Sequence, residues 1–506
     1  MGDVATYLFN GLIASLHPLN ILMIFFGLAI GMVAGVLPGI TMVNAIVLVL
    51  PFTYFMDITP ALLLMIGIYC GGCYAGTITG ILFNIPGDPM NVPQTWEGYA
   101  LKKKGLGSIA LGVAITTSAI GGLASGLIMT FASPPFIKIA LQFSSVEYFA
   151  IVFFGLTSVV ALATTSVLGA FISMLIGMFL ATVGVDPHYG TFRFSFGTEL
   201  LETGIDFIIV MIGLFAIGEI LDMLETESCK DITKETTEKE TTEKVKVKTN
   251  MPRPKDLWHL RGSISRGLGM GTIIGMISGA GAAIAAFVTY GVERQVRKAR
   301  EKFGSGSMAG LAAPETAANA STGGAMMALL SLGIPGSAAA AVMLGAFKLK
   351  GINPGPLLFA ENPHFVYTIF VGFLLTNFIM IFMGIGAAKV FAQLLRVPYA
   401  IMASFIVVFC SIGAFALRND VMDIWLAMIF GIVGYLMRRM KLPVAPMVLG
   451  LILGPLAEDY FRVSMTMHQN NLLVFFTRPI SAVFMVISFA DLLYPLLKGK
   501  FRRQKS

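Results

Sequence analysis

Two short polar sequences interrupt long apolar segments of this 506-residue chain. The first is NIPGDP at residues 84–89, and the second is IPGS at residues 334–337, in the corresponding part of the second half. A helix break at membrane depth leaves backbone N–H and C=O groups unpaired, so it persists only inside protein or beside a water-filled cavity. Two broken segments at matching places in two halves predict a transporter's binding site.

Two further breaks precede these. Residues 21–55 form an apolar run too long for one comfortable span, with Leu37, Pro38 and Gly39 in its middle. Residues 266–290 form a second run, interrupted by SGAG at residues 278–281. Proline removes a backbone donor and glycine lowers the cost of a turn, so each run predicts a hairpin or a pair of half-helices. Basic loops flank the second run on both sides, which favours a re-entrant hairpin.

The chemistry that such breaks offer is anion binding. Each break starts a new helical segment, whose free N–H groups carry partial positive charge and bind anions without a basic side chain. Helix capping explains each polar residue near a break when it is taken alone, but four breaks in two matched pairs favour a small-anion pocket. The predicted substrate-binding residues are Pro38, Gly39, Thr41, Asn44, Asn84, Pro86, Gly87, Gly279, Gly281, Ser321, Pro335, Gly336 and Ser337.

A carboxylate lies in an otherwise small and apolar segment just before the second break. Glu315 and Asn319 are four residues apart and share a helix face. An ionisable residue in a membrane segment is a functional hypothesis by default, so we predict that Glu315 and Asn319 bind a coupling ion, H⁺ or Na⁺. The alternative is a carboxylate at a solvated helix end after Pro314. Asp88 would repel an anion, so we assign it to ion coupling or to capping. No other metal and no cofactor is expected.

The composition places these residues in a membrane. The chain is 56% hydrophobic and only 12% charged, whereas soluble proteins carry roughly 25% charge. The apolar runs are continuous rather than alternating, which predicts helices and excludes a barrel. At about 20 residues for each span we expect an all-α polytopic protein with roughly ten to twelve crossings or part-crossings. The net charge is +7, and the basic residues cluster between or after these runs. This placement indicates cytoplasmic loops rather than nucleic-acid binding.

The pattern predicts three regions. Residues 1–225 form a first transmembrane repeat, residues 226–262 a charged hydrophilic linker, and residues 263–506 a second repeat with a basic C-terminal tail. The basic segment 294–302 corresponds to the nearly uncharged segment 51–60, which favours inverted repeats. Lys102 to Lys104, set against Lys348 and Lys350, argue for parallel ones. The apolar run at 443–457 is short enough that we expect an incomplete crossing.

No enzyme motif is present in the sequence. It has neither a G-x-x-x-x-G-K-[ST] loop nor an H-E-x-x-H pair, and its five histidines are scattered without ligand spacing. We therefore expect no enzymatic activity. Besides a transporter of small anions, we consider a cation-coupled transporter of another small solute, such as an amino acid, and a channel.

Several separated motifs resemble the large membrane subunit of the tripartite tricarboxylate transporters. They are LPG at 37–39, NIPGDP at 84–89, APETAANAS at 313–321, LGIPGSAAAAVMLGA at 332–346 and GINPGP at 351–356. The resemblance implies a multi-pass protein of the cell inner membrane that imports citrate-like tricarboxylates or dicarboxylates, driven by a proton or sodium gradient.

The same resemblance implies inverted repeats and an elevator-like mechanism. It implies two partners, a small four-helix membrane subunit and an extracytoplasmic solute-binding protein, and we also consider a homodimer. Residue by residue, it implies that the two Pro-Gly loops, Pro86-Gly87 and Pro335-Gly336, clamp the substrate. The segment from Glu315 to Asn319 would lie beside them.

Overall fold

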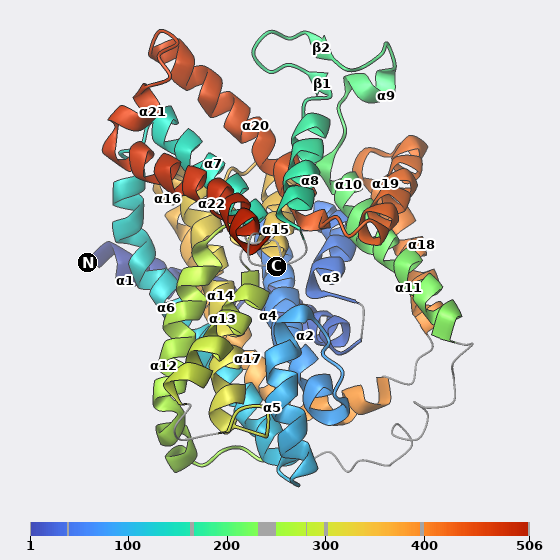
Figure 1. Cartoon of the computed structure of the whole chain (residues 1–506), viewed down its shortest axis with the longest axis vertical. Helices are drawn as coiled ribbons and strands as arrows, with labels where there is room; N and C mark the ends of the chain where they lie inside the picture. The colour runs from blue at the N-terminus through green and yellow to red at the C-terminus, as the bar shows by residue number, and fades with distance from the viewer. Residues whose placement is uncertain are drawn as a thin grey trace.

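The computed structural model describes residues 2–37, 40–161, 166–230, 249–279, 281–297, 302–394 and 399–503. These residues are almost entirely helical, as predicted (Figure 1). The strands among them are β1 (Gly184–Val185) and β2 (Phe192–Arg193), which pair antiparallel with Gly184 opposite Arg193.

The first half contains α1 (Gly2–Ser15), α2 (Pro18–Val36), α3 (Met42–Val49), the 3₁₀ helix η1 (Leu50–Phe55), α4 (Ile58–Phe83), the 3₁₀ helix η2 (Pro89–Asn91), α5 (Val92–Lys103), α6 (Gly107–Ala140), α7 (Ser145–Ala161) and α8 (Val167–Leu180). After the hairpin come α9 (Glu199–Glu202), α10 (Phe207–Met211), the π-helical turn η3 (Ile212–Ile217) and α11 (Gly218–Lys230).

The second half contains α12 (Pro254–Met276), α13 (Gly281–Val296), α14 (Met308–Leu332), α15 (Ala338–Leu349), α16 (Pro356–Glu361), α17 (Pro363–Leu394), α18 (Tyr399–Arg418), α19 (Val421–Arg439), α20 (Val444–Met467), α21 (Val474–Thr477) and α22 (Pro479–Arg503). All four predicted breaks therefore separate helices: α2 from α3, α4 from α5, α12 from α13 and α14 from α15. Of the predicted linker, residues 231–248 lie outside the described residues, and residues 254–262 belong to α12.

Seven helices of the described part are long and apolar enough to cross a membrane, which supports the multi-pass class. They include α4, α6 and α20, whereas α3, α7, α8 and α15 are apolar but shorter. The run at 443–457 belongs to α20, whose 24 residues are enough for a full span, so the prediction of an incomplete crossing underestimated this helix.

Glycines at every fourth position allow α2 to lie directly on α4, and α12 on α14. In α2 these are Gly27, Gly31 and Gly35, and a Cβ at any of them would collide with a backbone carbonyl of α4. In α12, Gly267, Gly271 and Gly275 meet α14 in the same way, at the carbonyls of Ala313, Ala317 and Ser321. Small residues let membrane helices approach this closely, so van der Waals packing holds each pair together.

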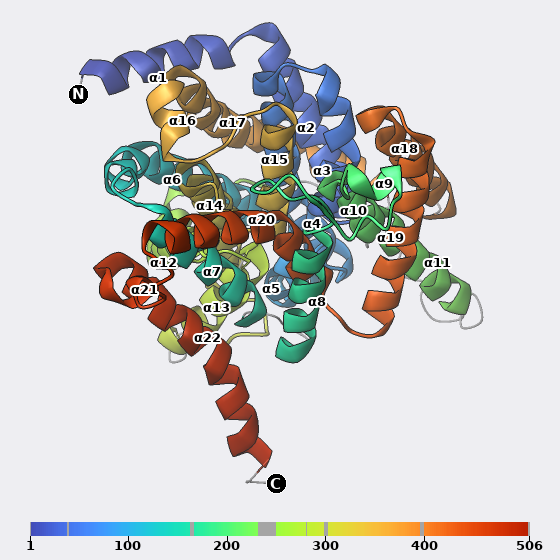
Figure 2. The same cartoon turned by 90° about the horizontal axis from the view of Figure 1, so that it is seen from above.

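Figures 1 and 2 show how the other elements are placed. In Figure 1, the β1–β2 hairpin lies at the upper end with α20 and α21, whereas α5 lies near the lower end. Seen from above, α1 runs along one edge and α22 extends away from the helical body (Figure 2). The helix pair α6 and α14 and the pair α4 and α17 join the two halves, because each pair packs one helix from either half.

Candidate functional site

The first core break lies between α4 and η2. Asn84 ends α4 in the left-handed conformation, with φ of 61°, and is exposed. The Gly87 N–H then donates to the carbonyl of Gly76 at 3.3 Å. A Cβ at Gly87 would collide with the carbonyl of Gly35 in α2. Pro86 is half-buried and Gly87 is buried. The Pro-Gly turn therefore packs against the α2–α4 pair.

The second core break repeats this packing between α14 and α15. Gly333 ends α14 with φ of 73°, and a Cβ at Gly336 would collide with the carbonyl of Gly275 in α12. The Pro335 carbonyl accepts a hydrogen bond from Ser278 Oγ at 3.0 Å. Ser337 caps α15 by accepting from the Ala340 N–H at 3.1 Å. Unlike the first break, residues 333–337 are all buried.

The two earlier breaks lie against the core breaks. Thr41 caps α3, because its Oγ1 accepts from the Asn44 N–H at 3.3 Å. The Asp88 carboxylate lies beside the backbone N–H groups of Met42, at the start of α3, and of Met90. The partial positive charge of a helix N-terminus stabilises an anionic side chain nearby, although the Asp88 side chain makes no cap hydrogen bond to η2.

In the second half, Gly281 starts α13 with φ of 58°, and a Cβ there would lie 3.8 Å from the Ser337 Cβ. Gly279, with φ of 76°, packs against Val159 of α7 instead. Pro38 and Gly39, the predicted residues of the first hairpin, lie outside the described residues.

Tyr69, in the middle of α4, reaches the second core break. Its hydroxyl and Ser337 Oγ are 3.0 Å apart and hydrogen-bonded. Because α4 leads to the first core break, this fully buried tyrosine links the helix before the first break to the start of the helix after the second. Sequence reasoning missed Tyr69, because a tyrosine in an apolar helix gives no signal of its own.

Glu315 lies fully buried in α14, not at a solvated helix end as the alternative interpretation required. Its Oε1 accepts from Ser118 Oγ of α6 at 2.5 Å, and its Oε2 accepts from Thr77 Oγ1 of α4 at 2.7 Å. Asn319 Nδ2 lies 3.3 Å from Oε1. The predicted pair is therefore brought together. Thr77 and Ser118 were missed, since a single hydroxyl in an apolar helix is also common as a packing residue.

Ser321, like Gly279, is a predicted residue whose contacts in the structure are packing contacts. Its hydroxyl donates to the Ala318 carbonyl of its own helix at 2.7 Å, and its backbone carbonyl lies against Gly275 in the α12–α14 contact. Ser321 therefore contributes to helix packing rather than to the lining of a break.

Glu97 lies in α5, the helix that follows the first break. Its hydrogen bonds connect α5 to the second half of the chain. The buried carboxylate accepts from the Tyr290 hydroxyl of α13 at 2.8 Å. It also accepts from the backbone N–H groups of Gly306 and Ser307 at 2.9 and 2.8 Å, at the start of α14. This carboxylate lies at a helix N-terminus with every oxygen paired, which indicates a structural role.

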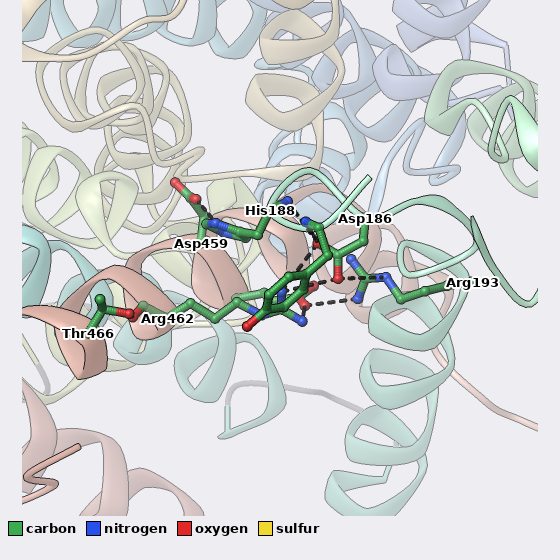
Figure 3. Close-up of polar contacts among 8 residues, drawn as sticks. Asp186, His188, Arg193, Asp459, Arg462 and Thr466 are labelled. Carbon is green, nitrogen blue, oxygen red and sulfur yellow. Dashed lines mark hydrogen bonds and ion pairs between the residues drawn. The ribbon is translucent and has the colours of Figure 1, made fainter. Parts of the chain in front are cut away.

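A charged cluster lies far from the breaks along the chain, where the β1–β2 hairpin meets α20 (Figure 3). Asp186 is within 3.1 Å of Arg462 and 3.5 Å of Arg193, and His188 is 3.1 Å from Asp459. Burial raises the pKa of the Asp186 carboxyl, but the backbone N–H groups of His188 and Tyr189 and the Arg462 guanidinium outweigh it and hold the pKa below its ordinary value. These ion pairs attach the hairpin to the helix.

Broken apolar helices, glycine-packed helix pairs and buried polar residues at the breaks define the class, a multi-pass membrane protein of the transporter type. The profile of the tripartite tricarboxylate transporter TctA family matches residues 21–449. The chain belongs to this family, and its resemblance to these transporters is thereby confirmed.

Two relatives from Agrobacterium vitis are similar to the chain. An uncharacterized 52.8 kDa protein in the TAR-I ttuC' 3'region is 34% identical over 498 residues, covering 98% of this chain and 97% of the relative. An uncharacterized protein in the TAR-II ttuC' 3'region is 33% identical over 227 residues, covering 45% of this chain and 94% of the relative. No solved structure matches the chain significantly.

Proposed function

We propose that this chain is the translocating subunit of a secondary transporter that imports tricarboxylates or dicarboxylates such as citrate across the cell inner membrane. A small four-helix membrane subunit and an extracytoplasmic solute-binding protein complete the system. Membership of a tripartite transporter family supports partner subunits, and the breaks at two matched places support a mid-membrane binding site.

The observation that carries this proposal is the shared packing of the two core breaks. Gly87 lies against Gly76, and Gly336 lies against Ala325, in each case eleven positions earlier in the preceding helix. Each of the two glycines also meets the carbonyl of the last glycine of a packed helix, Gly35 or Gly275. This correspondence supports two repeats that bring their breaks to one place. We propose that the repeats are inverted and move as an elevator.

The second break offers the better substrate contacts. Three groups at this break can bind an anion. The N-terminus of α15 is a positive helix end, and the hydroxyls of Ser337 and Tyr69 are hydrogen-bond donors. At the first break, the Pro86-Gly87 turn contributes backbone groups. Glu315 and Asn319 couple a cation, H⁺ or Na⁺, to this movement.

The test is uptake of labelled citrate into proteoliposomes that contain the chain, its small subunit and its binding protein. We expect concentrative uptake under a sodium or proton gradient. Loss of one hydrogen bond to a charged ligand costs about 1.5–3 kcal/mol, so Ser337→Ala should weaken apparent substrate affinity by roughly ten-fold or more. Ser173→Ala removes a buried hydroxyl of α8 that is distant in the chain and serves as the control. Uptake that is independent of any gradient would indicate a channel instead.

Glu315→Gln tests the coupling role in the same vesicles. The substitution keeps the shape and removes the charge, so accumulation should fall to the level of passive equilibration while substrate exchange persists. Unchanged concentrative uptake would remove Glu315 from the mechanism.

A further inference from the structure

A cleft of about 590 Å³ lies between α7, α8, α20 and α22, four helices that pack together. Its walls are apolar and rich in aromatic rings, with Phe153 from α7, Met178 from α8 and Phe461 from α20 among them. Gly454 of α20 also lines it, and a Cβ there would lie no closer than 3.4 Å to Met178. The cleft therefore has room for an apolar ligand that the breaks do not use.

The cleft is open on a side of the molecule that is itself apolar. Leu175 and Phe179 line the cleft and are 46% and 52% exposed. Beside them, Leu168 of α8 and Val486 of α22 are more than half exposed. Exposed apolar surface of this kind on a multi-pass protein contacts lipid. An acyl chain of the surrounding membrane can therefore enter the cleft.

One end of the cleft is charged. Glu458 of α20 lines the cleft, and its carboxylate lies 2.9 Å from the Arg193 guanidinium and 2.7 Å from that of Arg462. The Asp459 side chain, next along α20, is 50% exposed. Figure 3 shows Asp459 and the two arginines in the cluster where the β1–β2 hairpin meets α20. Guanidinium donors and carboxylate acceptors thus lie side by side at the mouth of an apolar cleft.

The hairpin beside this charged end carries exposed aromatic side chains. Tyr189, Phe192 and Phe196 are all more than half exposed. Phe194 packs on Phe179 of α8, with ring centroids 5.0 Å apart, and Phe179 lines the cleft. Aromatic side chains with a polar tip, such as Tyr189, are typical of the membrane–water interface. The charged end of the cleft therefore lies at the depth of the lipid headgroups.

We propose that the cleft binds a membrane phospholipid whose headgroup carries a primary ammonium, as in phosphatidylethanolamine. One acyl chain occupies the cleft, the phosphate accepts hydrogen bonds from Arg193 and Arg462, and the ammonium donates to Asp459. Guanidinium groups match phosphate, and carboxylates match an ammonium with its three N–H donors. The charged end has three carboxylates, Asp186, Glu458 and Asp459, against two guanidiniums, which disfavours a purely anionic lipid.

An apolar helix of another membrane protein is the other occupant that such a cleft could take. It would cover the aromatic walls, but it would supply no charged partner for the exposed Asp459 carboxylate, and a charged group that faces hydrocarbon is costly. A zwitterionic headgroup satisfies both kinds of charge at once. The inference goes beyond the proposed transport function and needs only that the chain lies in a membrane.

The test is native mass spectrometry of the purified full chain, stripped of lipid in detergent and then titrated with phosphatidylethanolamine, phosphatidylcholine or phosphatidylglycerol. We expect one phosphatidylethanolamine to bind saturably and more tightly than either other lipid. The reason is that a choline headgroup has no N–H donor and a glycerol headgroup has no positive charge.

Two variants test the two parts of the site. Ala181→Trp places an indole in the cleft, which Ala181 lines, and should remove saturable binding. Asp459→Asn should weaken phosphatidylethanolamine binding about ten-fold, the usual effect of losing a hydrogen bond to a charged group. Ile429→Trp is the matched control, because Ile429 of α19 is 53% exposed and does not line the cleft. It should bind the lipid as wild type does.

The inference is overturned if the wild-type chain binds no lipid saturably, if phosphatidylglycerol binds at least as tightly, or if Ala181→Trp binds as wild type does. Should Ala181→Trp not fold, phosphatidylethanolamine with a photoreactive diazirine in its acyl chain decides the question on the wild-type chain. Crosslinks to α7, α8 or α20 support the site, and crosslinks confined to other helices overturn it. A co-purified membrane protein that displaces the lipid would assign the cleft to a partner helix and would likewise overturn it.

Discussion

The glycines of the two Pro-Gly turns lie where no side chain fits. Gly87 faces the carbonyl of Gly35, and Gly336 faces the carbonyl of Gly275, so in both cases an added methyl group meets a backbone atom that cannot rotate away. Breaks of this kind can bind a substrate through backbone groups, because the backbone can approach the substrate closely where there is no side chain. Proline and glycine together made these positions predictable from sequence.

Gly87→Ala and Gly336→Ala should each abolish transport and lower the stability of the chain by about 1–3 kcal/mol, the usual cost of overpacking. Gly291→Ala is the matched control, because nothing lies within 4 Å of a Cβ there. Citrate uptake and the melting temperature in detergent measure the two effects. Full transport by either break variant would show that the turn has room that the structure does not give it.

The polar network around Glu315 shows the limit of sequence reasoning on single residues. Glu315 and Asn319 were predicted because a carboxylate in an apolar helix is conspicuous. Thr77, Ser118 and Asn91 were not, since each is ordinary in its own segment and gains meaning only when α4, α6 and α14 pack together.

Helix pairs with glycine at every fourth position carry the breaks. In α12, the face with Gly271 touches α14, whereas Gly269, two residues earlier, has nothing within 4 Å of a Cβ. Substitutions at these two positions of one helix therefore distinguish the effect of the helix–helix contact from the effect of intrinsic helix propensity. The spacing of the glycines can be seen in the sequence, but it does not indicate which helix packs against them.

Gly271→Ala should destabilise the chain by about 1–3 kcal/mol, because its Cβ would force α12 away from α14. Gly269→Ala should be neutral or stabilising by about 1 kcal/mol or less, because alanine favours a helix. Thermal unfolding in detergent compares the two. Equal melting temperatures would mean that the α12–α14 contact is looser than described.

The β1–β2 hairpin should detach from α20 at low pH. The pKa of Asp186 is lowered in the folded state, so its ion pairs contribute stability that is fully present above its ordinary pKa of 3.8 and is lost as the pH falls through the lower folded value. Hydrogen exchange at residues 184–193 should therefore accelerate below about pH 4. Asp186→Asn should show fast exchange already at neutral pH; slow exchange in that variant would contradict the role of these ion pairs.

The arrangement of the whole chain could be predicted in part. Composition and run length predicted the all-helical membrane class, which the structure confirms. The two related halves, predicted from the paired breaks, stay a prediction. The number of spans and the extent of α20 could not be fixed, because helix ends and tilts depend on packing against neighbours. For the same reason the contact between Tyr69 of α4 and Ser337 at the start of α15 has no sequence signature.

Basic loops and the charged hairpin should face opposite sides of the membrane. Lys302 precedes α14, and Tyr189, which is 77% exposed, lies between β1 and β2. Figure 1 shows α5 and the β1–β2 hairpin at opposite ends of the molecule. The positive-inside rule then places Lys302 in the cytoplasm. In intact cells a membrane-impermeant maleimide should label Tyr189→Cys and not Lys302→Cys. The opposite pattern would invert the topology.

The most direct test of the binding site is a structure of the chain determined in sodium and citrate. We expect citrate between the two core breaks, within hydrogen-bond distance of Ser337, the Tyr69 hydroxyl and the first N–H groups of α15. Citrate bound elsewhere, or a pair of breaks filled by side chains when citrate is bound, would contradict the account.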